Sequence, residues 1–179
     1  MKRLLDLSRW TAAAGLAAVT AGLACSCRRA GVPASRLYEK AGGFSYVTPD
    51  GWTRTRVAGI KYRIVAGPER DGVAPNLYIV DEDTPEPMGA YLAGFLARQR
   101  KTYPDFAIVG SNTLVTAQGL AAEVLDATRS ARGSPLSLRF YFLPQEKRVV
   151  VVTCTWAASS GDERRQVFDD AMRSFRFED

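Results

Sequence analysis

The stretch that most constrains the fold is residues 135–175, where two strand patterns and a helix pattern follow one another with short connections. Apolar residues alternate with Ser, Arg and Tyr over 136–142, which is typical of a strand with one buried face. Residues 149–156 are apolar or Thr at every position, which predicts a central strand with both faces covered. Residues 160–163 match a capping box and precede an apolar helical face. This face is predicted to comprise Val167, Phe168, Ala171, Met172 and Phe175.

The rest of the chain predicts further strands and a second helix. Strand patterns occur at residues 44–48, 52–57, 60–65, 77–80, 107–116 and 120–128. The turn residues Pro49-Asp50-Gly51 predict a hairpin between the first two of these strands. Residues 87–103 form an amphipathic helix pattern that ends at Pro104. Because hairpins imply antiparallel pairing and two amphipathic helices imply two covered faces, we predict an α+β domain over residues 42–179, an antiparallel β-sheet sandwiched between helices.

The N-terminus has the pattern of a secretory signal over residues 1–24. Residues 1–9 are basic, and residues 10–24 are uncharged and end in small residues. This apolar run is shorter than the ~20 residues that a transmembrane helix requires. An uncleaved membrane anchor is the alternative interpretation.

The residues around Cys25 resemble the bacterial lipoprotein processing site, at which a lipidated Cys becomes the new N-terminus. Cys25 is the favoured lipidation site and Cys27 is the alternative. The match is imperfect at both positions, because neither Cys has the Leu that the pattern prefers three residues earlier. Several acyl chains would provide stable anchoring to a membrane that faces the periplasm or cell exterior. Ser26, in place of Asp, favours the outer membrane, and residues 25–41 would form the tether. Secretion with a disulfide between Cys27 and Cys154 is the competing interpretation.

The composition argues against several functions. The chain has no His, which removes the usual general base of hydrolases and the commonest zinc ligand. A net charge of +5, part of which lies in the N-terminal segment, is too small to indicate nucleic acid binding. We therefore expect no catalytic residues, no cofactor and no nucleic acid partner.

A few side chains are candidates for a site. Asp81, Asp83 and Glu86 could bind a hard cation such as Ca²⁺, although acidic residues before a helix also suit its dipole. A hydrolase would need carboxylates, such as Asp81 or Glu123, to meet in a cleft. Cys154 alternates with large apolar residues and is expected to act as a small buried hydrophobe.

Four basic residues are predicted to form a strip on the hairpin of residues 52–65. If Ala58-Gly59 is its turn, Arg56 lies opposite Lys61 and Arg54 opposite Arg63. Like charges placed opposite one another are destabilising, so the strip could face an anionic protein partner or membrane headgroups. A solvated strip that protects the sheet edge is the alternative.

Residues 43–52, Gly-Phe-Ser-Tyr-Val-Thr-Pro-Asp-Gly-Trp, resemble the opening hairpin of the PsbP-like family. Residues 75–80, residues 119–122 and Ser174-Phe175 are similar to later segments of the same family. The resemblance implies an αβα sandwich, shared with lipoproteins of the DcrB and LpqN kinds and with a Ran-binding nuclear transport factor. It also implies a binding or assembly module rather than an enzyme.

We therefore predict a membrane-tethered extracytoplasmic lipoprotein that binds an envelope protein or complex without catalysis. Since some PsbP-like proteins are extrinsic subunits of photosystem II, that role is the first alternative. A small hydrolase or cation-binding protein that uses carboxylates is the second.

Overall fold

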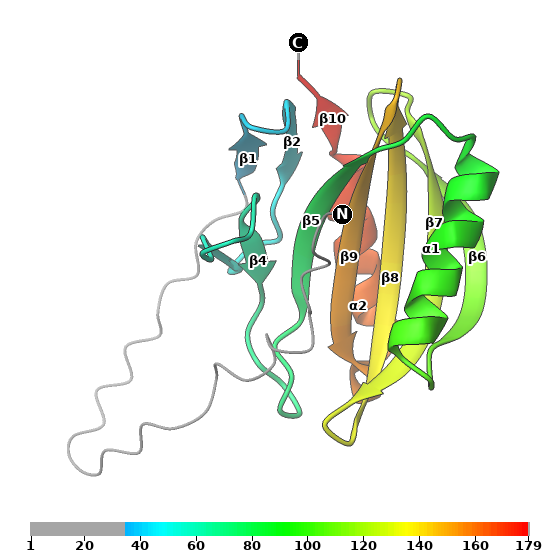
Figure 1. The fold of residues 1–179 in the computed structure, drawn as a ribbon. Coiled ribbons are helices and arrows are strands. Elements are labelled where there is room, and N and C mark those ends of the chain that lie inside the picture. Colours follow the sequence, from blue (N-terminus) through cyan, green and yellow to red (C-terminus); the bar gives the residue numbers. More distant parts are fainter. Residues whose placement is uncertain (1–34, 179) are drawn as a thin grey trace.

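The computed structural model describes residues 35–178, which form two antiparallel sheets and two α-helices (Figure 1). The large sheet has seven strands in the order β3-β4-β5-β9-β8-β7-β6. Its strands are β3 (Thr53–Thr55), β4 (Ile64–Ala66), β5 (Asn76–Asp83), β6 (Ala107–Val115), β7 (Ala121–Ala131), β8 (Ser134–Gln145) and β9 (Arg148–Ala157). The predicted α+β class with a large antiparallel sheet is confirmed.

The predicted scaffold of residues 135–175 forms the centre of this sheet. β8 and β9 pair from Leu136 opposite Ala157 to Gln145 opposite Arg148. Every residue of β9 after Arg148 is buried, which confirms the prediction of a strand covered on both faces. β8 is also buried on both faces over residues 138–143, so the prediction of a single buried face was wrong.

The two helices pack against different sets of sheet residues. α1 (Met88–Thr102) places Phe95 against Phe140 and Phe142, with ring centroids 5.1 and 5.0 Å apart. α2 (Glu163–Arg173) and the following Phe175 pack in a second cluster with Tyr141 and Leu143. Residues 140–143 therefore point alternately to one cluster and the other, and Figure 1 shows α1 in front of the sheet, beside β8, and α2 behind the sheet.

The apolar face predicted for α2 is confirmed, but the predicted capping box at the start of the helix is not. Phe168, Ala171, Met172 and Phe175 are buried, and Val167 is partly buried. The helix begins at Glu163 after Asp162, and no side chain caps it. Ser160 instead belongs to the short 3₁₀ helix η2 (Ala158–Ser160), so it is not in position to complete the predicted capping box.

A small second sheet was not predicted. It has the order β1-β2-β10 and comprises β1 (Arg36–Glu39), β2 (Phe44–Val47) and β10 (Arg176–Phe177). β1 falls within the predicted tether, so the folded domain starts earlier than residue 42. The turn at Pro49-Asp50-Gly51 forms, with Gly51 at φ +75°, but β2 pairs with β1 and β10 and not with β3. The predicted hairpin was therefore wrong.

Neither helix within residues 35–178 has the length and hydropathy needed to cross a membrane. The predicted signal at residues 1–24 and the lipidation sites Cys25 and Cys27 lie outside the described residues.

Candidate functional site

A groove of about 530 Å³ lies between the β2–β3 turn and α2. Its apolar lining comprises Val47, Pro49, Trp52, Pro68, Val167 and Ala171. Asp50, Arg164 and Asp170 add charged side chains to the same lining. This size and this mixture of an apolar wall with a few polar groups are typical of binding sites in proteins.

The wall of the groove depends on Trp52, which is nearly fully buried. Its ring meets the edge of Phe168 on α2, with centroids 5.4 Å apart and an interplanar angle of 90°. Gly67 also lies against the indole, where an added Cβ atom would come within 2.7 Å of the ring. Trp52 is thus held between α2 and the loop that follows β4, and the groove has a rigid side.

The chain enters the folded domain beside this groove. The backbone N–H of Thr48, a groove residue, donates to the carbonyl oxygen of Ser35 at 3.1 Å. Arg54 also donates to that oxygen, at 2.9 Å, and to the Thr48 hydroxyl, at 2.6 Å. The first described residue, Ser35, is therefore fixed next to the groove, and the preceding part of the chain joins the folded domain at this point.

The predicted register of the basic strip was wrong. β3 and β4 pair with Thr53 opposite Ala66 and Arg54 opposite Val65, so the two like-charge pairs do not form. Residues 56–63 make a longer connection because Tyr62 leaves the strand pattern to be buried against Phe44, with ring centroids 4.9 Å apart.

Three of the four basic side chains have partners inside the domain. Lys61 forms a salt bridge with Asp81 at 2.7 Å, and Arg63 lies 3.4 Å from the buried Glu39. Arg54 binds Ser35 and Thr48 as described above, while Arg56 is exposed. A role of this strip toward a partner stays a prediction, but the repulsion that motivated it is absent.

The acidic candidates lie on and just after β5, which extends to Asp83. Asp81 binds Lys61 and also lies 3.5 Å from Arg148. Asp83 and Glu86 are exposed, and no group of three or more acidic or Cys side chains within residues 35–178 is arranged to hold a metal ion. Glu123 is on β7, three strand positions from β5 and hence about 14 Å from it, so Asp81 and Glu123 do not meet.

The Lys61–Asp81 salt bridge predicts a pH-dependent contribution to stability. Partial burial acts to raise the pKa of Asp81, but the hydrogen bonds from Lys61 outweigh it and hold the pKa below its usual value. A lowered pKa in the folded state stabilises the protein above the unfolded-state pKa of about 3.9, and this stabilisation is lost as the pH falls through the folded-state pKa.

We therefore expect Lys61→Met to lower the free energy of unfolding by about 0.2–1 kcal/mol at pH 7 and by less at pH 3. Urea denaturation at the two pH values measures this difference. Lys101→Met, at an exposed position of α1, serves as the control. An equal loss at both pH values would contradict the assignment of the effect to the Asp81 carboxylate.

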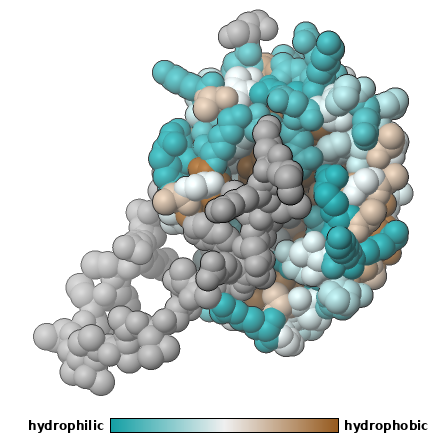
Figure 2. Space-filling view, viewed as in Figure 1, coloured by the Kyte–Doolittle hydropathy of each residue, from teal (hydrophilic) through white to brown (hydrophobic). Residues whose placement is uncertain are grey.

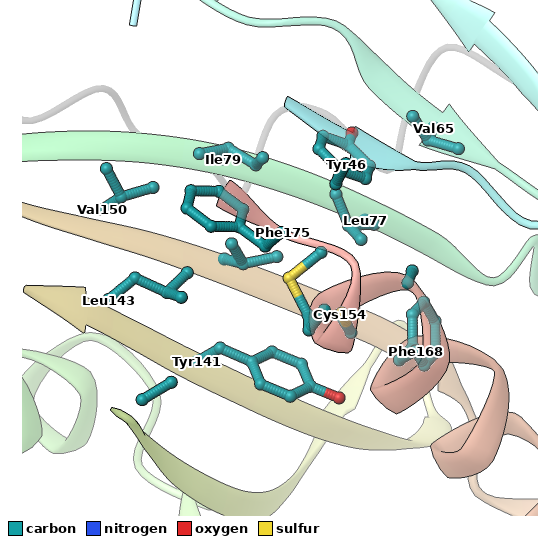
Figure 3. Packing of buried hydrophobic residues seen from close by; sticks show 14 of the residues in the cluster. Tyr46, Val65, Leu77, Ile79, Tyr141, Leu143, Val150, Cys154, Phe168 and Phe175 are labelled. Atoms are coloured by element: carbon teal, nitrogen blue, oxygen red, sulfur yellow. The ribbon is translucent and has the colours of Figure 1, made fainter. Parts of the chain in front are cut away.

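Cys154 lies in the middle of the core. Figure 3 shows its sulfur between β9 and the side chains of Tyr141, Phe168 and Phe175. The residue has no exposed surface, and burial raises the pKa of its thiol well above the usual value. Cys154 is free in the structure, and its burial agrees with the small buried hydrophobe that was expected. The alternative disulfide involves Cys27, which lies outside the described residues, and stays a prediction.

The structure contains a buried ionic cluster that the sequence did not predict. Arg139 on β8 is 2% exposed, and its guanidinium donates to both carboxylate oxygens of Asp126, at 2.6 and 2.7 Å. Its Nε donates to Asp169 at 2.9 Å, and the Tyr141 hydroxyl donates to the same carboxylate at 2.6 Å. We call these four residues the Arg139 cluster.

The Arg139 cluster is a structural feature rather than an open binding site. It borders a small cavity of about 170 Å³ that Asn112 and Arg173 also line. Burial alone would lower the pKa of Arg139, but the hydrogen bonds to Asp126 and the negative charges nearby raise it above the usual value. The guanidinium is therefore a fixed positive charge whose donors are already occupied, mainly by the two carboxylates and also by Tyr141 and Asn112.

No protein-family model matches the sequence, and no curated protein matches it. Several solved structures are nevertheless similar in fold. Cyanobacterial PsbP (CyanoP) from Synechocystis sp. PCC 6803 has a TM-score of 0.61 and 16% identity, over 85% of this chain and 97% of that one. LpqN, involved in cell envelope biogenesis of Mycobacterium tuberculosis, has a TM-score of 0.58 and 15% identity, over 83% and 87%.

The Ran-binding protein Mog1p of Saccharomyces cerevisiae is also similar, with a TM-score of 0.59 and 11% identity over 83% of this chain and 97% of that one. At these identities the likeness concerns the fold alone. The domain thus has a PsbP-like fold, as the resemblance of residues 43–52 implied.

Proposed function

We propose that this chain is an exported lipoprotein whose PsbP-like domain, an αβα sandwich, is a non-catalytic module that binds an apolar segment of an envelope protein. The observation that carries the proposal is the groove beside Ser35. Proteins with this fold include an envelope biogenesis protein and a Ran-binding protein, which supports a binding role. Cyanobacterial PsbP shares the fold too, so an extrinsic photosystem II subunit is the second candidate.

The length of the proposed tether bears on the partner. Cys25 precedes Ser35 by ten residues, which span at most about 35 Å when extended. The entry point next to Thr48 would keep the groove within this reach of the membrane. A membrane protein that presents an apolar segment near the bilayer surface is therefore the class of partner that fits.

The test is affinity capture of the full-length chain from its native membrane, with and without Val167→Lys in the groove. Because a lysine would place a charge against the apolar wall, we expect at least a tenfold loss of the captured partner. Gln166→Lys is the matched control, since Gln166 is exposed on the same helix and does not line the groove. Circular dichroism of both variants checks that they fold.

Mass spectrometry of the mature N-terminus tests the tether separately. An acylated Cys25 is expected, and an acyl group on Cys27 would correct only the site. An intact Met1 with no acyl group would refute the lipoprotein proposal. Capture that is unaffected by Val167→Lys would refute the groove as the binding site. Recovery of photosystem II components would select the second candidate function.

A further inference from the structure

β6 forms one edge of the large sheet, and its sequence lacks the usual protection of an edge strand. Its nine residues, Ala-Ile-Val-Gly-Ser-Asn-Thr-Leu-Val, include no charged residue and no Pro. Figure 1 shows β6 at the outer margin of the sheet, and Figure 2 shows apolar residues along the same margin, over α1 and β6. Long uncharged edges are sites where another strand can pair.

The opposite edge of the sheet differs in each of these respects. β3 has only three residues, and Arg54 lies at its centre. Arg56 follows it directly and is exposed. Short length and charge are the devices that prevent edge pairing, so the contrast between β3 and β6 singles out β6.

The hydrogen bonds of the β6–β7 turn show which backbone groups point outward. The N–H of Thr116 donates to the carbonyl oxygen of Leu120 at 2.9 Å, so Thr116 faces β7. Because antiparallel strands alternate in the direction of their backbone groups, Ser111, Thr113 and Val115 direct their N–H and C=O groups away from β7. All three side chains are exposed, and Val115 is 59% exposed.

These three residues define a symmetric pairing segment. The register of β6 with β7 shifts between Ile108 and Gly110, so the regular ladder available to a new strand begins after this bulge. Its outward-facing residues are centred on Thr113. A two-fold axis at this residue places Thr113 opposite its own copy and Ser111 opposite Val115.

We propose that β6 pairs antiparallel with the β6 of a second copy of this chain, which joins the two large sheets across a two-fold axis at Thr113. The absence of charge favours an identical strand as the occupant. A charged residue near the axis would meet its own copy and repel it, whereas Thr opposite Thr is a favourable cross-strand pair. An uncharged edge also offers nothing that would select an oppositely charged partner.

Light scattering of the full chain in detergent tests the proposal, and we expect a dimer. Thr113→Pro should give a monomer, because it removes an N–H that points away from β7 and so leaves the fold intact. Thr113→Lys should weaken the dimer at least tenfold, since two lysines would meet at the axis. Thr113→Val, which keeps the backbone groups and the β-branched side chain, is the control and should remain dimeric.

A Thr113→Cys variant gives an independent measurement. Residues opposite each other in a hydrogen-bonded pair have Cα atoms about 5.5 Å apart, a separation that permits a disulfide. We expect cross-linked dimers through residue 113, mapped by mass spectrometry, and much less cross-linking through Ser111→Cys. A wild-type chain that is monomeric at about 100 μM, dimers that persist in both Thr113→Pro and Thr113→Lys, or no disulfide at residue 113 would each overturn the proposal.

Discussion

Replacing Arg139 with Met is expected to lower the free energy of unfolding by about 3–5 kcal/mol, the range for removal of one partner from a buried ion pair. The side chain is 2% exposed and joins β8 to β7 through Asp126 and to α2 through Asp169. Without the guanidinium, Asp169 loses its counter-charge and Asp126 keeps only the more distant Arg165, at 3.8 Å. Urea denaturation followed by circular dichroism measures the loss.

The triple variant Arg139→Met, Asp126→Asn, Asp169→Asn separates charge from packing. It leaves no unpaired carboxylate, so it should be more stable than Arg139→Met alone although it carries two further substitutions. Arg139→Lys should fall between the wild type and Arg139→Met, since an ammonium keeps the charge but lacks the bidentate geometry. A triple variant less stable than Arg139→Met would show that unpaired carboxylates are not the cause of the stability lost in Arg139→Met.

Phe168→Ala is expected to destabilise the domain by a similar amount, about 3–5 kcal/mol. Phe168 has no exposed surface and its ring contacts Trp52 and Trp156, with centroids 5.4 and 5.5 Å away. The substitution removes the contact between α2 and the groove wall and leaves a cavity behind. Thermal and urea unfolding measure the effect.

Gln166→Ala is the matched control on the same helix. Gln166 is exposed, and its side chain bonds only to Asp170 in the described contacts, so the loss should stay within about 0.5 kcal/mol. If Phe168→Ala cost no more than this control, α2 would not be held to the sheet by the packing described here.

The long, strongly periodic segments could be predicted from the sequence. Helix α1 was expected over residues 87–103 and spans Met88–Thr102, and β9 was expected to be buried on both faces. Each of these elements is long enough for its apolar residues to repeat several times, so the local sequence is sufficient to identify it.

The short elements could not be predicted, because they are too short to show a period and several depend on pairing or packing with other parts of the chain. β1 has only four residues, and β10 has two and pairs with β2 near the other end of the domain. The register of β3 and β4 depends on the burial of Tyr62 against Phe44. The groove combines residues around positions 50 and 167, so its existence follows from the fold and not from a motif.

The Arg139 cluster was missed for a related reason. Arg139 alternates with Leu138 and Phe140, and a charged residue at such a position is usually solvent-exposed. The signal that could have placed it inside is Asp169, which stands between the buried Phe168 and Met172 on the apolar side of α2. A carboxylate at that position needs a buried cation, and β8 supplies one.

From the strand order of the large sheet we expect an order of folding. β6, β7, β8 and β9 follow one another through short turns, so their contacts can form early and locally. β5 instead pairs with β9, from Asp83 opposite Arg148 to Asn76 opposite Thr155, and closing a loop of this length is slow. During synthesis from the N-terminus, β3, β4 and β5 can pair with one another, but the other edge of β5 has to wait for β9. A chain that stops before β9 lacks the strand that joins β3, β4 and β5 to the rest of the large sheet.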